Sequence, residues 1–68
     1  MRVISQNGSI SVDFDRTAFL RDGNCICAVV GGVSRVIGCY ASDELADEIF
    51  WDMHNEKRDR GAYIYRMP

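Results

Sequence analysis

The sequence predicts an α+β fold: a bent antiparallel β-meander of about five strands, with one long helix packed on it and a short C-terminal strand. Two observations predict this class. Short runs rich in β-branched residues are separated by the pairs Asn-Gly, Asp-Gly and Gly-Gly, which favour hairpin turns. Further along, residues 42–60 carry apolar side chains at helical spacing and are followed by an alternating stretch, AYIYRM. With 68 residues, the chain is expected to form a single domain, residues 1–68.

The first hairpin is predicted over residues 1–14, with a two-residue type I′ turn at the Asn-Gly pair of positions 7 and 8. Folding about this turn places Arg2 opposite Asp13 and Val3 opposite Val12. One face of the hairpin becomes apolar and the other polar, and a slip of one residue would mix the two. The sequence therefore specifies the register of this hairpin.

The centre of the sheet is predicted from two further turns. The Asp-Gly pair at positions 22 and 23 joins residues 17–21 to residues 24–30 and places Phe19 opposite Ile26. The Gly-Gly pair at positions 31 and 32 then turns this strand into residues 33–40. Both faces of the second hairpin carry apolar side chains, which is typical of strands covered on both sides. We expect the helix to cover one face, and either sheet closure or a second copy of the chain to cover the other.

The helix is predicted from Ser42 to Arg60, because serine is a favoured N-cap and Gly61 is a favoured residue just past a helix end. At 100° per residue, one apolar stripe is expected to meet the sheet, and it comprises Leu45, Ala46, Ile49, Phe50 and Met53. The only tryptophan, Trp51, falls on the opposite side of the helix among polar residues.

Composition and charge argue against several classes of function. The net charge is −2, whereas proteins that bind DNA or RNA normally present a strongly basic surface, so nucleic acid is not the expected partner. No apolar run approaches the ~20 residues of a membrane span, and the first residues lack the pattern of a signal peptide. We therefore expect a cytoplasmic protein that has no membrane partner.

The three cysteines, Cys25, Cys27 and Cys39, are expected to be reduced thiols that are partly buried. Their number is odd, and a Cys-x-Cys pair within a strand places both sulfurs on one face, side by side. A tetrahedral zinc site would need a fourth ligand, and none is evident. We therefore expect no metal and no cofactor.

Groups suited to catalysis are few. The only histidine, His54, is predicted to be solvated on the helix surface, and its helical phase turns it away from the cysteines of the sheet. The carboxylates near it lie on an open helix face, whereas acid–base catalysis needs a sheltered site. The glycine pair at positions 31 and 32 lacks the lysine of a phosphate-binding loop. We expect a protein that is not an enzyme.

Trp51 carries the principal functional hypothesis. Tryptophan is enriched in interface hot spots and is seldom left in water. Three environments are open for the indole: it packs on an edge strand of its own monomer, it is buried in a symmetric dimer, or it binds a different protein. We predict a homo-oligomeric binding protein that occludes a protein partner of its host, with a binding surface made of Trp51, Asp47, His54, Asn55 and Arg58.

An alternative hypothesis is an oligomeric sponge that sequesters a nucleotide-type signalling ligand. A last strand is predicted over residues 62–67, with two tyrosines on one side. Aromatic rings beside arginines can stack on a base and bind its phosphate. The ligand pocket is expected between subunits, and its lining residues would be Tyr63, Tyr65, Arg58, Arg60 and Arg66.

The N-terminal stretch MRVISQNG, followed by Ile10 and Val12, resembles the start of a group of short uncharacterised proteins of phages and integrated elements in Gram-positive bacteria. Those proteins begin M-R-[VI]-I-S-Q-[DN]-G. Residues 37–46, IGCYASDELA, are similar to a second block of the group that leads into a helix, with Ile37 in place of leucine. Trp51 stands where the group usually carries a milder residue. The resemblance implies a phage or mobile-element accessory protein in the cytoplasm of a bacterial host cell, with an anti-defence role by analogy.

Overall fold

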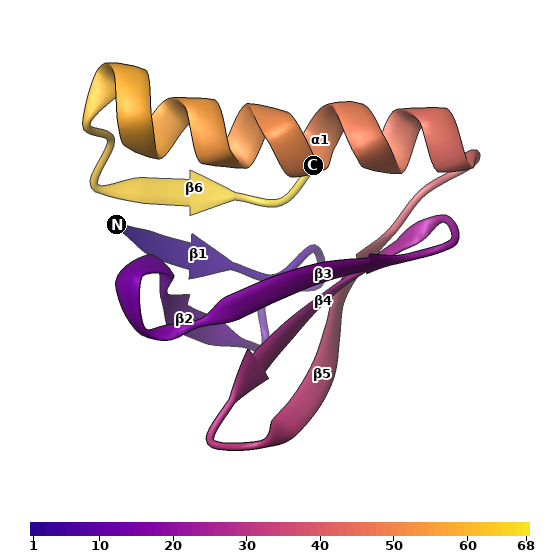
Figure 1. Ribbon diagram of the computed structural model, residues 1–68, viewed down its shortest axis with the longest axis horizontal. Coiled ribbons are helices and arrows are strands. Elements are labelled where there is room, and N and C mark those ends of the chain that lie inside the picture. Colours follow the sequence, from indigo (N-terminus) through magenta and orange to yellow (C-terminus); the bar gives the residue numbers. More distant parts are fainter.

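The computed structural model describes residues 1–68 and confirms the α+β class (Figure 1). Six strands form two three-stranded sheets, and one long helical segment packs on them. The strands are β1 (Arg2–Ile4), β2 (Ser11–Asp13), β3 (Ala18–Asp22), β4 (Cys25–Val30), β5 (Val33–Cys39) and β6 (Ile64–Arg66). The first sheet has the order β2-β1-β6 and the second the order β3-β4-β5. The predicted meander is therefore divided between two sheets.

The first hairpin, β1 and β2, has the predicted antiparallel register, with Val3 opposite Val12. Its turn is not the predicted type I′ turn, which needs a positive φ at both central residues. Only Gly8 has a positive φ, of 75°. The side-chain carbonyl of Asn7 accepts hydrogen bonds from the amide and the hydroxyl of Ser9, at 3.0 and 2.7 Å. A longer loop, organised by the asparagine side chain, thus produces the same register.

The third strand of this sheet comes from the other end of the sequence. β6 lies parallel to β1, with Val3 opposite Tyr65, and both of these side chains are buried. Parallel neighbours need a long crossover connection. Here the crossover comprises the second sheet and the helix (Figure 1).

The second sheet begins with a turn at Gly23 and Asn24, so the predicted Asp-Gly turn one residue earlier is wrong. Gly23 has a φ of 59° at the first central position, where a type II′ hairpin requires glycine. Phe19 therefore lies opposite Ala28 rather than Ile26. The register shift amounts to two residues, so each side chain keeps its predicted face.

A β-bulge divides the pairing of β4 with β5. The strands are joined by the predicted Gly-Gly turn, and both glycines have positive φ, 57° and 79°, as a type I′ turn requires. Beyond the turn, Cys27 is opposite Val36, whereas Ile26 is opposite Gly38. Ile37 is the extra residue, and it is buried in the core. The bulge moves the end of β5 by one residue, which exchanges the sheet faces of the side chains beyond it.

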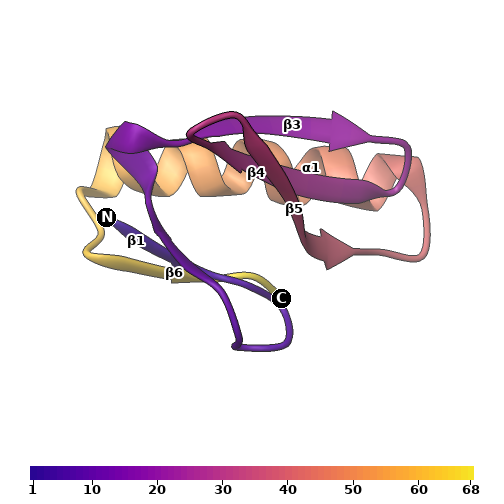
Figure 2. The ribbon, with the colours of Figure 1, turned by 90° about the horizontal axis from the view of Figure 1, so that it is seen from below.

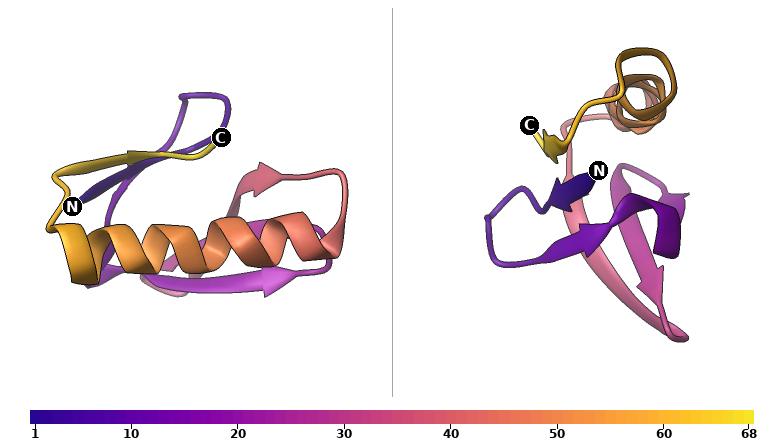
Figure 3. Two further views of the ribbon diagram at one scale, coloured as in Figure 1. Left: turned by 90° about the horizontal axis from the view of Figure 1, so that it is seen from above. Right: turned by 90° about the vertical axis from the view of Figure 1, so that its left-hand side faces the viewer.

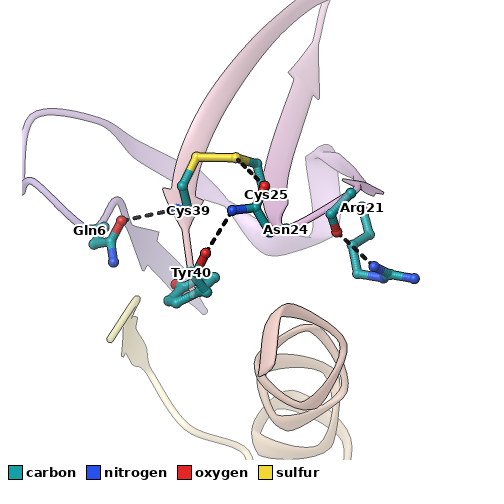
Figure 4. The surroundings of a disulfide bond; sticks show 7 residues. Gln6, Arg21, Asn24, Cys25, Cys39 and Tyr40 are labelled. Carbon is teal, nitrogen blue, oxygen red and sulfur yellow. Dashed lines mark hydrogen bonds between the residues drawn. A yellow bond between two sulfur atoms is a disulfide. The ribbon is translucent and has the colours of Figure 1, made fainter. Parts of the chain in front are cut away.

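Cys25 and Cys39 are joined by a disulfide, so the prediction of three free thiols is wrong (Figure 4). In a hairpin without a bulge, the two side chains would point to opposite faces of the sheet. The bulge brings Cys39 directly opposite Cys25, with the two Cα atoms 4.1 Å apart. Cys27 is a free, buried thiol. Disulfides are rare in reducing compartments, so a cytoplasmic chain would be stabilised by this bond only while the pair is oxidised.

The two sheets are tied together beside the bulge by Gln6. Its backbone amide donates a hydrogen bond to the carbonyl of Ile37 at 2.7 Å. Its side-chain carbonyl accepts one from the amide of Cys39 at 3.0 Å (Figure 4). The first hairpin loop thus covers part of the free edge of β5.

The helical segment begins and ends where the sequence predicts. α1 spans Asp43–Asn55 and continues as a π-helical turn over Glu56–Arg60. Ser42 is the N-cap, and its hydroxyl accepts a hydrogen bond from the amide three residues on, at 3.1 Å. Gly61 is left-handed, with a φ of 59°, and its amide donates to the carbonyl of Glu56, which is the π-helical spacing. The last turn is therefore wider than the predicted α-helix. No helical segment has both the length and the hydrophobicity that crossing a membrane requires.

The core lies between α1 and the two sheets, and β3, β4 and β5 spread across the helix in Figure 2. Within the predicted apolar stripe, Ala46, Ile49 and Met53 are buried, while Leu45 is 39% exposed and Phe50 lies at the edge. The right-hand view of Figure 3 looks nearly along α1 and shows both sheets on one side of it. The buried apolar cluster consists of Val3, Ile26, Ala28, Ile37, Ile49, Met53, Tyr65 and Met67.

Candidate protein-binding face of the helix

Trp51 lies on the outer side of α1, as its helical phase predicts, and it is 54% exposed. Its ring meets the ring of Phe50 edge-on, at a centroid distance of 5.4 Å and an interplanar angle of 83°. The ring of His54, which lies 4.6 Å from that of Phe50, is on the same side of the indole at a centroid distance of 5.5 Å. The indole therefore contacts aromatic rings of its own chain on one side and is open to solvent on the other. It is not buried against an edge strand of its own chain.

His54 packs among aromatic rings, so the prediction of a solvated histidine is wrong. Its ring lies 4.6 Å from that of Phe50 and 5.3 Å from that of Phe14, and it is half-buried. Phe19 of β3 completes the group, 5.3 Å from Phe14. Nδ1 of His54 is 2.7 Å from the carbonyl oxygen of Phe50 and donates to it, since a carbonyl can only accept. Helical phase places this histidine at the border of the buried stripe, and β3 and the turn before it cover that border.

Two ion pairs join the helical segment to β3 and to the turn before it, on either side of this group of aromatic rings. Asp47 lies 3.5 Å from the guanidinium of Arg21 near one end, and Lys57 lies 3.6 Å from the carboxylate of Asp15 near the other. Partly exposed ion pairs of this kind contribute about 1 kcal/mol or less, so they orient the helix more than they stabilise it. Asp47, a predicted binding residue, is thus partly occupied within its own chain.

The remaining predicted residues of the face are exposed and bonded to each other. Arg58 donates to the side-chain carbonyl of Asn55 at 3.0 Å and to the carboxylate of Asp59 at 2.9 Å. The hydrogen bond to Asp59 is the main cause that raises the pKa of the guanidinium above its ordinary value. Both Asn55 and Arg58 remain open to solvent. The structure therefore brings Asp47, Trp51, Asn55 and Arg58 onto the outer side of the helix, with His54 at its border.

The alternative ligand site is not assembled within one chain. Tyr65 is a core residue, 8% exposed, whereas Tyr63 is 89% exposed, so the two tyrosines do not form a shared surface. The predicted alternation holds for Tyr65 and Met67, which are both buried, but not for Tyr63, because β6 begins only at Ile64. Arg60 is paired with Glu56 at 3.4 Å, and Arg66 is exposed. The two surface cavities, of about 130 and 260 Å³, include none of the five predicted lining residues. A nucleotide site between subunits stays a prediction.

The Tyr65 hydroxyl has a structural role, and it makes the free energy of unfolding depend on pH in the alkaline range. It donates to the Asp52 carboxylate at 2.7 Å. Burial, followed by this hydrogen bond, raises the pKa of Tyr65 above its ordinary value of 10.0. Below about pH 10 the tyrosine is protonated in both states and its contribution is complete. Above that pH the unfolded chain loses the proton first, so stability falls as pH rises towards the folded-state pKa.

We expect the free energy of unfolding to decrease from pH 9 to pH 11, and the decrease to be smaller in Tyr65→Phe. Urea unfolding at each pH measures both. Burial also raises the pKa of Tyr40, so part of the pH dependence remains in the variant. An identical pH dependence in the two proteins would contradict the assignment to Tyr65.

A second apolar surface was not assigned a role by the sequence. Leu20, Cys27 and Val36 are neighbours across β3, β4 and β5, on the face of the sheet that also carries the disulfide. Leu20 is 43% and Val36 56% exposed, although Cys27 between them is buried. This arrangement agrees with the predicted two-sided apolar hairpin. The cover that was expected on this face is not supplied by the chain itself.

Comparison of the chain with protein-family models, with curated proteins and with solved structures finds no match. No group of three or more His, Cys, Asp or Glu side chains is placed to hold a metal ion. The strongest candidate site is therefore defined by geometry alone. It is an exposed aromatic ring, fixed by neighbouring rings and surrounded by polar side chains, on the outer side of a long helix.

Proposed function

We propose that this chain is a small, non-enzymatic binding protein that attaches to a protein partner through the outer face of α1 and blocks the contacts of that partner. One observation carries the proposal. The only tryptophan is 54% exposed near the middle of the helical segment, whereas Met53, two residues away, is fully buried. Tryptophan and arginine are enriched in interface hot spots, and a buried indole adds a large apolar area to an interface.

The surroundings of Trp51 support this proposal. The rings of Phe50 and His54 both contact the indole from the side of its own chain, which limits its side-chain freedom before a partner covers it. Asp47, Asn55 and Arg58 provide a polar rim that can exclude water from the centre of a contact. A rigid aromatic centre within a polar rim is the usual arrangement of a protein-binding surface.

The biological setting is part of the same proposal. The resemblance of the N-terminal stretch and of residues 37–46 to phage and integrated-element proteins supports an accessory role in the cytoplasm of a bacterial host. In that setting, a small protein that occludes a host or regulatory partner would act against a defence system. Identification of the captured partner would test this part separately.

Trp51→Ala is expected to weaken partner binding by ~2 kcal/mol or more, since the indole is the only large aromatic group at the centre of the face. Protein captured from bacterial lysate would be compared between the original chain and the variant, together with the mass of each purified protein in solution. The matched control is Tyr63→Ala, which removes an 89% exposed aromatic ring from a different surface. If Trp51→Ala left both self-association and capture unchanged, the proposal would be abandoned.

A further inference from the structure

We propose that the outer face of α1 is complementary to itself, and that two copies of the chain pair through antiparallel helices with Trp51 at the two-fold axis. This inference rests on the proposed function, because it takes the same face as the binding surface and names a second copy as its first occupant. It is carried by the order of charges along the helix and by the position of Trp51 within it.

The outward stripe of the helical segment has a regular composition. It lies opposite the buried residues Ala46, Ile49 and Met53, and all of its members are exposed. Their spacing of three and four residues keeps them on one side of the helix. From the N-terminal end, the stripe reads Glu44, Glu48, Trp51, Asn55 and Arg58. It is acidic before the tryptophan, and its only charge after the tryptophan is basic.

A two-fold axis through Trp51 places acidic residues of one helix opposite basic residues of the partner helix. In an antiparallel helix pair, a residue that precedes the axis faces the residue that follows it by the same distance in the partner. Glu44 precedes Trp51 by as many positions as Arg58 follows it, so Glu44 faces the partner's Arg58. In the same way, Glu48 faces the partner's His54, at the border of the face, and Asn55 faces the partner's Asp47. Because the axis acts on both copies, each of these contacts occurs twice.

Tryptophan is well suited to the axis itself. Trp51 lies at the middle of the helical segment Asp43–Arg60, so the two helices overlap along their whole length. The two indoles meet each other, and stacked or edge-on aromatic pairs are favourable beyond the area they bury. A parallel arrangement would instead align acidic ends with acidic ends and the helix dipoles with each other, which is unfavourable.

The fold leaves room for this contact. Both sheets lie on one side of α1, so a second helix can approach the other side to the usual distance of about 8–10 Å (Figure 3). Arg58 must exchange its contacts with Asn55 and Asp59, and these exposed bonds cost little to lose. A single helix pair lies at the low end of interface sizes, below roughly 1,200 Å², so the dimer is expected to be weak and to depend on concentration. A different protein that uses this face would compete with the second copy.

Charge reversal at the two ends of the stripe tests the pairing. Sedimentation equilibrium of the full chain over a wide concentration range is expected to show a monomer–dimer equilibrium. Glu44→Arg and Arg58→Glu should each weaken self-association about tenfold or more, because each replaces two attractive pairs with two repulsive ones. An equimolar mixture of the two variants should recover the dimer, since both pairs between the different chains are then attractive.

Two controls accompany this measurement. Asp22→Arg and Arg66→Glu make the same charge changes at exposed positions outside the outward stripe of the helical segment, and should leave self-association unchanged. Circular dichroism and thermal unfolding show whether each variant is folded, and recovery in the mixture excludes misfolding as the cause of a loss.

The inference and the proposed function fail in different ways. A chain that is monomeric at every concentration, or a mixture that does not recover the dimer, overturns the inference. If capture of another protein still depended on Trp51 in that case, the proposed function would stand. If the mixture recovers the dimer but no other protein is captured, the antiparallel pairing stands and the proposed occlusion of a partner fails.

Discussion

Met53→Ala is expected to lower the free energy of unfolding by ~2–5 kcal/mol, the range measured when a large buried side chain is truncated. Met53 is fully buried and belongs to the cluster through which α1 packs on both sheets. A domain of this size has a net stability of roughly 3–10 kcal/mol. The substitution should therefore remove a large part of the stability and leave much of the chain unfolded at physiological temperature.

Urea unfolding followed by circular dichroism measures this loss. Met53→Leu is the matched control, because it nearly keeps the volume of the side chain and should cost less than about 1.5 kcal/mol. Trp51→Ala is the second comparison, since it truncates a larger side chain on the outer side of the same helix. If Met53→Ala were no more destabilising than Trp51→Ala, the helix could not be packed on the sheets by the face described.

Replacing both Cys25 and Cys39 with serine is expected to lower the free energy of unfolding by about 3 kcal/mol, the chain-entropy contribution of a cross-link that closes a loop of this length. The bond joins the two strands at the bulge, where regular pairing is interrupted. The strand end that it holds leads directly into Ser42 and the first turn of α1. Loss of the bond should therefore weaken the junction between the second sheet and the helix.

The same loss should follow when a reductant is added to the original chain. Urea unfolding with and without reductant measures it, and the mass of the oxidised chain should be lower by two hydrogen atoms. The double serine variant is the control, because the reductant should leave its stability unchanged. An original chain whose stability and mass do not respond to the reductant would contain two thiols instead of a disulfide.

Local signals predicted most of the fold. The register of the first hairpin follows from its alternating faces, although Asn7 organises a longer loop than expected. The ends of the helical segment follow from Ser42 and Gly61, which satisfy the end groups of a helix wherever it packs. The outward place of Trp51 follows from helical phase alone.

Features that depend on distant contacts were not predictable. Gly38, next to Ile37, is only a weak local signal of the bulge, since glycine within a strand often marks one. The bulge lies where Gln6 of the first hairpin loop meets β5. The disulfide was missed for the same reason, since the bulge changes the face of Cys39. In the candidate site, Phe50 is a neighbour of His54 by helical spacing, but Phe14 and Phe19 come from β3 and the turn before it, which no local pattern relates to the helix.

The pairing of β1 with β6 has a consequence for the kinetics of folding. It joins strands from opposite ends of the sequence, and Val3 meets Tyr65 only when the whole intervening chain has been closed into a loop. Small domains rich in such non-local contacts reach their native state in about milliseconds to seconds, more slowly than helical bundles. The β3-β4-β5 meander and α1 can form from neighbouring residues, so we expect docking of β6 to be the slow final step.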